Sequence, residues 1–366
     1  MIERIVELNE TKEWSRDLPH PTEEGLCSLL ALYGVSDAVD VGLLDTSHGA
    51  DDIRWNYIID KKYVLRLTNA PEMTEERLDD LNRLIGRYAE FGLRCPAFLK
   101  RTDGRFFHPW EELTAYLSEY VDLPIAEEAD LTETEKKALW QEICLSIAGF
   151  MERYKGVDLI STMGMYSLFD LSPYDAAEGF DEKQWNLNNL TAALRKAGAE
   201  DLANRLEAWN ESVRARLLAV YKTLPRCVTQ ADEGFTNVLL DEKKHMAGLI
   251  DFNLSGTDVC VNLIANNAIL DLDVPSDKPF DPQAELEKAL AGYRKNAARM
   301  LTVYSASEAE RDALVDYAWI ALVCQYPNAS ACIHRIEKEE TQTSALGLLE
   351  ALVTLDRSRL YVKKQT

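Results

Sequence analysis

The feature that most constrains the fold is a change of hydrophobic period about one third of the way along the chain. Short β-type runs separated by polar turns fill the first part, at 39–44, 55–59 and 62–67. From Thr132 onward, the chain carries apolar residues at three- and four-residue spacing, which is typical of amphipathic helices. The order predicts an α+β protein with a strand-rich beginning and a helix-rich remainder.

Individual elements follow from the same patterns. Thr22 is a plausible cap for a helix over 20–34, and the spacing of leucines predicts a second helix over 74–91. Two further strand-like runs lie at 97–100 and 105–107, and the expected helices of the second part at 135–154, 200–223, 282–304 and 307–326. A hairpin formed by 238–240 and 246–252 interrupts the helical part.

The size and composition favour two lobes in a reducing compartment. A chain of 366 residues with 46% hydrophobic content exceeds what one core usually supports. No run of about 18 apolar residues predicts a membrane span, and the acidic N-terminus lacks a signal-peptide core. Seven scattered cysteines without a Cys-x-x-Cys pair indicate a cytoplasmic protein.

The net charge of −22 argues against nucleic acid and anionic membranes as partners, because both require a basic surface. It is compatible with a cationic small-molecule substrate. An acidic surface also serves solubility alone, so charge does not decide between these alternatives.

The embedded hairpin carries the most informative chemistry. Asp232 lies in the loop before its first strand, Asn237 opens that strand, and Asp251 closes the return strand. Magnesium takes one or two carboxylates together with phosphate oxygens and water, so Asn237 and Asp251 suffice as protein ligands. Asp232 then remains to accept a proton from a hydroxyl in phosphoryl transfer. The simpler alternative is that Asp and Asn only form turns.

The run from Gln230 to Asn237, followed by Leu249-Ile-Asp-Phe252, resembles the aminoglycoside phosphotransferase family, which includes choline kinases. The resemblance implies a bilobal protein-kinase-like fold, with an N-terminal lobe over 1–120 and a helical lobe over 121–366. It implies Asp232 as the catalytic base and Asn237 and Asp251 as Mg²⁺ ligands. Gln230 and Ala231 depart from the His-Gly usual in the family.

The same resemblance implies a nucleotide site in the first lobe. Arg66 would clamp the phosphates, with a carboxylate partner among Glu76, Asp79 and Asp80, of which Asp80 is preferred. The remaining residues implied in cofactor binding are the phosphate-covering loop Ser47, His48 and Gly49, and the hinge positions Glu119 and Val121.

The acceptor pocket is expected from the helical lobe, with Asp258 and Asn262 in structural roles. Aromatic and acidic side chains suited to amines are Tyr166, Tyr174, Asp175, Asp181 and Trp185. Together these patterns predict a kinase that uses ATP or GTP with Mg²⁺ and an alcohol group of a small molecule as acceptor. The alternative is a nucleotide-binding pseudokinase that acts as an interaction module. The acceptor itself stays open.

Overall fold

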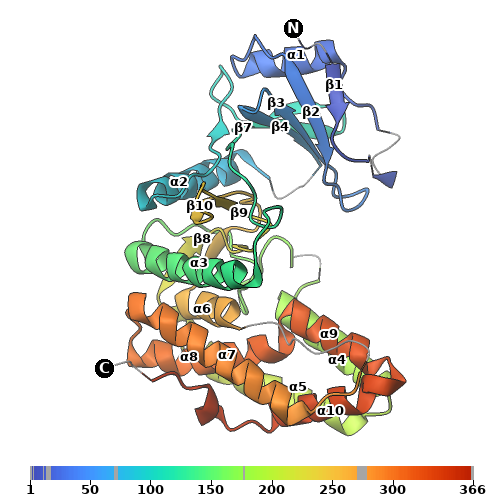
Figure 1. The fold of residues 1–366 in the computed structure, drawn as a ribbon, viewed down its shortest axis with the longest axis vertical. Coiled ribbons are helices and arrows are strands. Elements are labelled where there is room, and N and C mark those ends of the chain that lie inside the picture. Colours follow the sequence, from blue (N-terminus) through green and yellow to red (C-terminus); the bar gives the residue numbers. More distant parts are fainter. Residues whose placement is uncertain are drawn as a thin grey trace. The chain divides into compact units, whose positions relative to one another are not determined.

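The computed structural model describes residues 2, 4–10, 12, 13, 18–69, 73–175, 178–269 and 278–363. Within them the chain forms two compact units, one of residues 1–131 with 233–251 and the other of 132–232 with 252–366. The first unit therefore contains the 233–251 segment, which the sequence interpretation assigned to the helical lobe. The fold is mixed α+β, as the change of period predicts (Figure 1).

The first unit is built on a seven-stranded sheet in the order β1-β2-β3-β4-β7-β5, with β6 beside β7. Only β1 and β2 pair in parallel; the other pairs are antiparallel. The strands are β1 (Arg4–Glu7), β2 (Asp40–Asp45), β3 (Arg54–Ile59), β4 (Tyr63–Thr68), β5 (Phe98–Leu99), β6 (His108–Trp110) and β7 (Leu113–Glu119). The run predicted as a strand at 105–107 precedes β6 instead.

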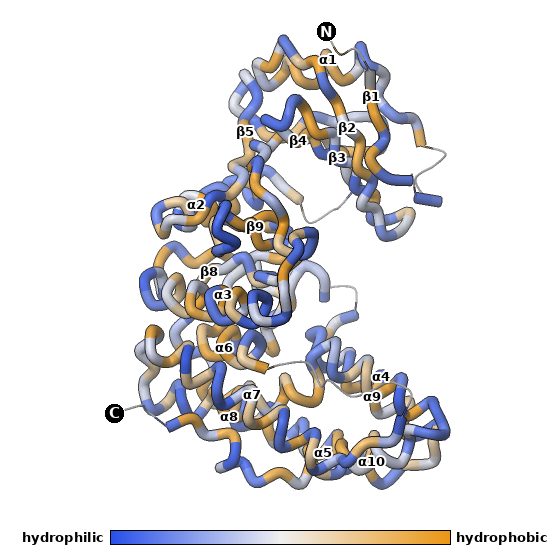
Figure 2. Tube along the Cα trace, in the orientation of Figure 1, coloured by the Kyte–Doolittle hydropathy of each residue, from blue (hydrophilic) through white to orange (hydrophobic). Residues whose placement is uncertain are grey.

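Helix α1 (Glu23–Leu32) supplies the core of this sheet. Thr22 caps it through the amide of Gly25, and Leu26, Leu29 and Leu30 are buried in one cluster with the inward residues of the strands. Figure 2 shows the corresponding hydrophobic stretches along these elements. Burial of such leucines contributes roughly 1.5–3 kcal/mol each.

Helix α2 (Glu75–Phe91) begins at the Thr74 cap and ends at Gly92, whose φ of 105° lies in the left-handed region. Asn82 joins the helix to β5 through both the amide and the carbonyl of Phe98. The hairpin β9 (Val238–Leu240) and β10 (Met246–Leu249) completes the unit. Arg94 lies so close to β10 that a Cβ on Gly248 would come within 2.2 Å of its carbonyl oxygen.

The described residues of the second unit form helices and one antiparallel strand pair, β8 (Arg226–Thr229) with β11 (Gly256–Val259). Helix α6 (Cys260–Ala268) is buried among α3, α7 and α8. Its helices are α3 (Glu133–Tyr154), α4 (Glu182–Lys196), α5 (Glu200–Leu218), α7 (Pro282–Val303), α8 (Glu308–Cys324), α9 (Tyr326–Ile336) and α10 (Glu339–Val353), with short 3₁₀ turns η2 (Tyr221–Thr223) and η3 (Arg357–Leu360). None of the helices among the described residues has the length and apolarity needed to cross a membrane.

Candidate functional site

The β9–β10 hairpin brings Asn237 and Asp251 to the same end of a two-stranded ladder. Val238 pairs with Leu249, and the Ile250 amide donates to the Asn237 carbonyl at 2.9 Å, so each polar residue lies just beyond the paired strands. Asn237 is buried, and so is the Oδ1 atom of Asp251. Amide and carboxylate oxygens in this arrangement fit a hard cation such as Mg²⁺, which would complete its shell with phosphate oxygens and water.

Asp251 adopts a φ of 57°, in the left-handed region. Asp tolerates this conformation better than most residues. The chain changes direction immediately after β10. Asp251 therefore does not follow the alternation of side chains along the strand. Residues held in sparsely populated conformations often belong to functional sites, because the surrounding structure must hold the strain.

The loop that carries Asp232 contains two of the residues at which the chain departs from the family pattern, Gln230 and Ala231. Gln230 is fully buried, and its Oε1 accepts the Asp232 amide at 2.7 Å. Ala231 adopts a φ of 73°, a conformation that glycine adopts at little cost. The glutamine therefore supports the loop by hydrogen bonding, and the alanine introduces backbone strain of about 1–2 kcal/mol.

Arg66 lies in the middle of three neighbouring strands, in register with Asn56 on β3 and Tyr116 on β7. Its Nε donates to Asn56 Oδ1 at 2.7 Å, and its Nη1 to the Tyr116 hydroxyl at 3.5 Å. These contacts hold the guanidinium on the sheet, where its fork of donors suits phosphate.

The predicted pairing of Arg66 with Asp80 is not formed in this structure. Asp80 forms its ion pair with Arg83, one turn further along α2, and Asp79 pairs with Lys100 at 3.0 Å. Residues three apart on a helix are neighbours, so Arg83 reaches Asp80 without any movement of the backbone. Nothing in the sequence indicates this competition, because Arg83 has the pattern of a solvated helix residue.

The loop between β2 and β3 is closed at its tip by an isolated bridge between Gly49 and Asp52. Ser47 is buried and accepts the Arg54 amide at 2.9 Å, whereas His48 is exposed and its amide donates to the Asp52 carbonyl. Ser47 thus stabilises the loop, and the amide of Gly49 makes no hydrogen bond within the described residues. Free amides near a glycine are typical of phosphate-binding loops.

The predicted hinge residues Glu119 and Val121 line an open cavity of about 710 Å³ in the first unit. The Tyr120 amide is engaged by the Lys62 carbonyl at 2.8 Å, and Glu119 donates its amide to the Ala97 carbonyl at 2.9 Å. The Val121 amide makes no hydrogen bond within the described residues. The role of Val121 and Glu119 in binding a nucleotide stays a prediction.

Residues predicted for the acceptor pocket divide into two groups. Asp181 caps α4 and forms a double hydrogen bond with Arg214, at 2.7 Å on both sides, so its role is structural. Tyr174 instead donates its hydroxyl to the Asn253 carbonyl at 3.2 Å, and Ser255 in turn contacts the Gln230 carbonyl. This chain of contacts connects Tyr174 to the Asp232 loop.

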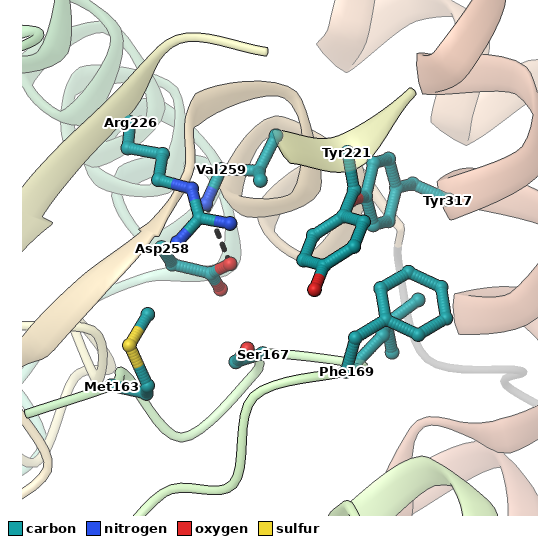
Figure 3. A pocket seen from close by; sticks show the side chains of 9 residues that line it. Met163, Ser167, Phe169, Tyr221, Arg226, Asp258, Val259 and Tyr317 are labelled. Atoms are coloured by element: carbon teal, nitrogen blue, oxygen red, sulfur yellow. Dashed lines mark hydrogen bonds between the residues drawn. The ribbon is translucent and has the colours of Figure 1, made fainter. Parts of the chain in front are cut away.

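A small cavity of about 10 Å³, roughly the size of one water, lies beside Asp258 (Figure 3). Asp258 is buried, accepts the amide of Val259 at 2.6 Å and the Asn262 side chain at 2.9 Å, and faces Arg226. Burial raises the pKa of Asp258 to about 7, against the opposing effect of these hydrogen bonds and of the Lys183 charge. Asp258 and Asn262 hold β11 to α6, as predicted for structural residues.

Sequence reasoning missed Lys183. It is 1% exposed, and its Nζ has no hydrogen-bond partner in the described part of the chain. The ammonium lies over the Tyr166 ring, 4.8 Å from the centroid. A lysine in the first turn of a helix reads as an ordinary surface residue, so nothing in the sequence marks its burial.

The chain is similar to known phosphotransferases in sequence and in fold. The model of the phosphotransferase enzyme family matches residues 47–260, more than half of the chain. An amicoumacin kinase in complex with AMP-PNP, Ca²⁺ and Ami is similar in structure over 87% of this chain and 91% of that one, at 12% identity and a TM-score of 0.50. Two others are spectinomycin phosphotransferase APH(9)-Ia (10% identity, 93% and 100% covered, TM-score 0.48) and a microcompartment-associated aminopropanol kinase (14% identity, 91% and 96% covered, TM-score 0.47). Comparison with curated proteins gave no significant match.

Proposed function

The chain belongs to the phosphotransferase enzyme family, and from that premise we propose that it is a kinase that transfers the γ-phosphoryl group of ATP or GTP to a hydroxyl of a small molecule. The observation that carries the proposal is the β9–β10 hairpin, which presents Asn237 and Asp251 at one end. A divalent ion held there would neutralise charge on the transferred phosphoryl group.

Each residue has a defined task in this reaction. Asp232, positioned through its amide by Gln230, accepts the proton of the acceptor hydroxyl. The acceptor oxygen forms a bond to the γ-phosphorus as the bond to the β–γ bridging oxygen breaks, and the nucleoside diphosphate leaves. Arg66, held by Asn56 and Tyr116, binds phosphate oxygens throughout.

The test is mass spectrometry of hydroxylated acceptors incubated with the protein, ATP and Mg²⁺. The panel should contain aminoglycosides, amino alcohols, sugars and hydroxy amino acids, and the expected product carries one phosphate. Asp232→Asn is the matched control, because it keeps the size of the side chain and removes the proton acceptor. Product formed equally by this variant would refute the role of Asp232.

One observation favours a second candidate, a nucleotide-binding module without turnover. Asp80 pairs with Arg83, so the ion pair predicted between Arg66 and Asp80 is not formed. A thermal-shift scan with nucleotides and Mg²⁺ separates the two candidates. Stabilisation by a nucleotide together with no phosphorylated product on any acceptor would support the module over the kinase.

A further inference from the structure

Lys183 violates three general preferences at once. It is buried to 1% exposure, its ammonium has no hydrogen-bond partner in the described part of the chain, and it lies in the first turn of α4. Burial of an unpaired charge is costly, and the positive end of a helix repels a cation. Such violations are expected where a side chain serves a ligand rather than the fold.

Glu182, the neighbouring residue, shows the complementary feature. Its Oε2 atom is buried and accepts no hydrogen bond among the described residues. Burial raises the pKa of the Glu182 carboxyl, and the charge of Lys183 acts in the opposite direction. Lys183 and Glu182 do not pair with each other, although their charges are opposite and they are adjacent in the chain. Two unsatisfied groups of opposite charge therefore stand side by side in sequence at the start of one helix.

The nearby carboxylates do not replace a partner for Lys183. Asp175 accepts from Ser172, and Asp258 accepts from Val259 and Asn262. Lys183 lies near enough for its charge to lower the pKa of both, yet neither forms an ion pair with it in the described part of the chain. Acidic groups therefore lie near the ammonium, and none of the described ones forms an ion pair with it.

The surroundings of Lys183 are connected to the loop of the proposed base. The Tyr166 carbonyl accepts from Asn262, and Gly164 and Thr162 exchange backbone hydrogen bonds with Thr257 of β11. The approach is so close that a Cβ on Gly256 would come within 2.3 Å of the Gly164 nitrogen. Gly256 pairs with Thr229, which directly precedes Gln230 in the chain.

Tyr166 is the aromatic residue that covers the ammonium. Tyr166 is half-buried, whereas Lys183 is fully buried. A ligand that reaches Lys183 from this side would exchange the ring contact for hydrogen bonds to the ammonium, which are stronger when the acceptor is ionised.

We infer that Lys183 and Glu182 form a subsite for a zwitterionic small molecule, with the ligand's carboxylate on Lys183 and its ammonium group on Glu182. A ligand with both charges satisfies both groups. An anion without an ammonium group would be repelled by the nearby carboxylates of Asp175 and Asp258. Under the proposed function, on which the assignment of this ligand as acceptor rests, the substrate class is a hydroxylated amino acid or a larger compound that carries both groups.

The first experiment measures the melting temperature of the ligand-free protein. Lys183→Met keeps the length of the side chain and its contact with Tyr166, and it removes the unpaired charge. The melting temperature should rise by about 2 °C, because apolar replacements of buried charges are often stabilising. Lys222→Met is the matched control, since Lys222 also lies over a tyrosine ring, at 5.8 Å, but is exposed. A lower melting temperature for Lys183→Met would show that the charge serves the fold and would overturn the inference.

The second experiment measures binding without nucleotide, by thermal shift with five related compounds. Serine carries both charges, ethanolamine lacks the carboxylate, and 3-hydroxypropionate lacks the amine; threonine and 1-amino-2-propanol repeat the first comparison. Serine or threonine at about ten times its dissociation constant should raise the melting temperature by about 2 °C, and the singly charged compounds should have little effect.

Two variants test which residue recognises which charge of the ligand. Lys183→Met should abolish the preference for serine over ethanolamine, and Glu182→Gln the preference for serine over 3-hydroxypropionate, whereas Lys222→Met keeps both. Equal shifts with all compounds, no shift at all, or preferences that survive in the variants would overturn the inference. Adding ATP and Mg²⁺ then separates the two proposals: binding with these preferences but no phosphorylated product leaves the subsite intact and removes the kinase.

Discussion

Two regions of this chain depart from low-energy geometry, and they do so in different ways. Around 230–251 the departure lies in the backbone, where Ala231 and Asp251 adopt left-handed φ values of 73° and 57°. Around 166–183 and Asp258 it lies in electrostatics, where Lys183 and Glu182 hold buried polar atoms without hydrogen bonds. Backbone strain fixes the position of a few atoms, as catalysis requires, whereas unsatisfied charge provides affinity for a ligand that supplies the missing partner.

The largest expected effect tests the catalytic role of the backbone-strained region. Asp232→Asn should lower kcat by about 10³-fold, because the amide cannot accept the proton of the hydroxyl. Nucleotide affinity, measured by calorimetry, should stay within about twofold, since binding and chemistry use different groups. A variant with near-normal kcat would mean that the strain around Asp232 has no catalytic purpose.

The next effect concerns the electrostatically strained region and its dependence on pH. Burial raises the pKa of Asp258 from 3.8 to about 7, so the folded protein binds more protons than the unfolded chain between these values. Its contribution to stability is therefore largest at low pH and is lost as pH rises from about 4 to about 7, by an amount on the order of a few kcal/mol.

The Asp258→Asn variant tests whether the contribution of Asp258 to stability falls as pH rises. Asparagine carries no charge at any of these pH values, so the variant should gain stability relative to the original protein as pH rises from 4 to 8. The measurement is the difference between the two unfolding free energies in urea at several pH values. A difference that is constant with pH would show that Asp258 does not titrate in this range.

The sequence predicted those features that depend on neighbouring residues in the chain, namely helix ends, strand positions and the hairpin register. Helix α2 begins within one residue of the expected start, because Thr74 and Gly92 mark its ends, and the strands β2, β3 and β4 lie within one residue of their predicted runs. Asn237 and Asp251 meet because a hairpin between apolar strands fixes its own register. Such features depend on neighbours in sequence.

The remainder depends on residues distant in sequence and could not be predicted in the same way. The parallel pairing of β1 with β2, the ion pair that occupies Asp80, and the burial of Lys183 each follow from which segments pack together. Asp181 shows the same limit, since its ion pair with Arg214 joins residues 33 apart. Charged residues on helices look alike in sequence, and only packing distinguishes a solvated group from a buried one.

Gln230 allows a smaller test of how the backbone-strained region is supported. Gln230→Met fills similar space but leaves the Asp232 amide without its acceptor, at a cost of about 1–3 kcal/mol in unfolding free energy. We expect kcat to fall about tenfold as Asp232 loses its orientation. Gln230→His, which restores a hydrogen-bonding side chain, should recover most of the activity; equal losses in both variants would indicate a requirement for glutamine's shape instead.

The smallest effect isolates backbone strain from every side-chain contact. Ala231→Gly relieves the left-handed conformation and should stabilise the protein by about 0.5–1 kcal/mol, the strain released exceeding the added flexibility of the unfolded chain. Ala192→Gly is the matched control, because Ala192 lies exposed within α4 and the same substitution there should destabilise by about 1 kcal/mol. Opposite signs, measured by urea unfolding, would establish that the strain at Ala231 is real. Equal signs would show that the left-handed conformation of Ala231 does not lower the stability of the protein.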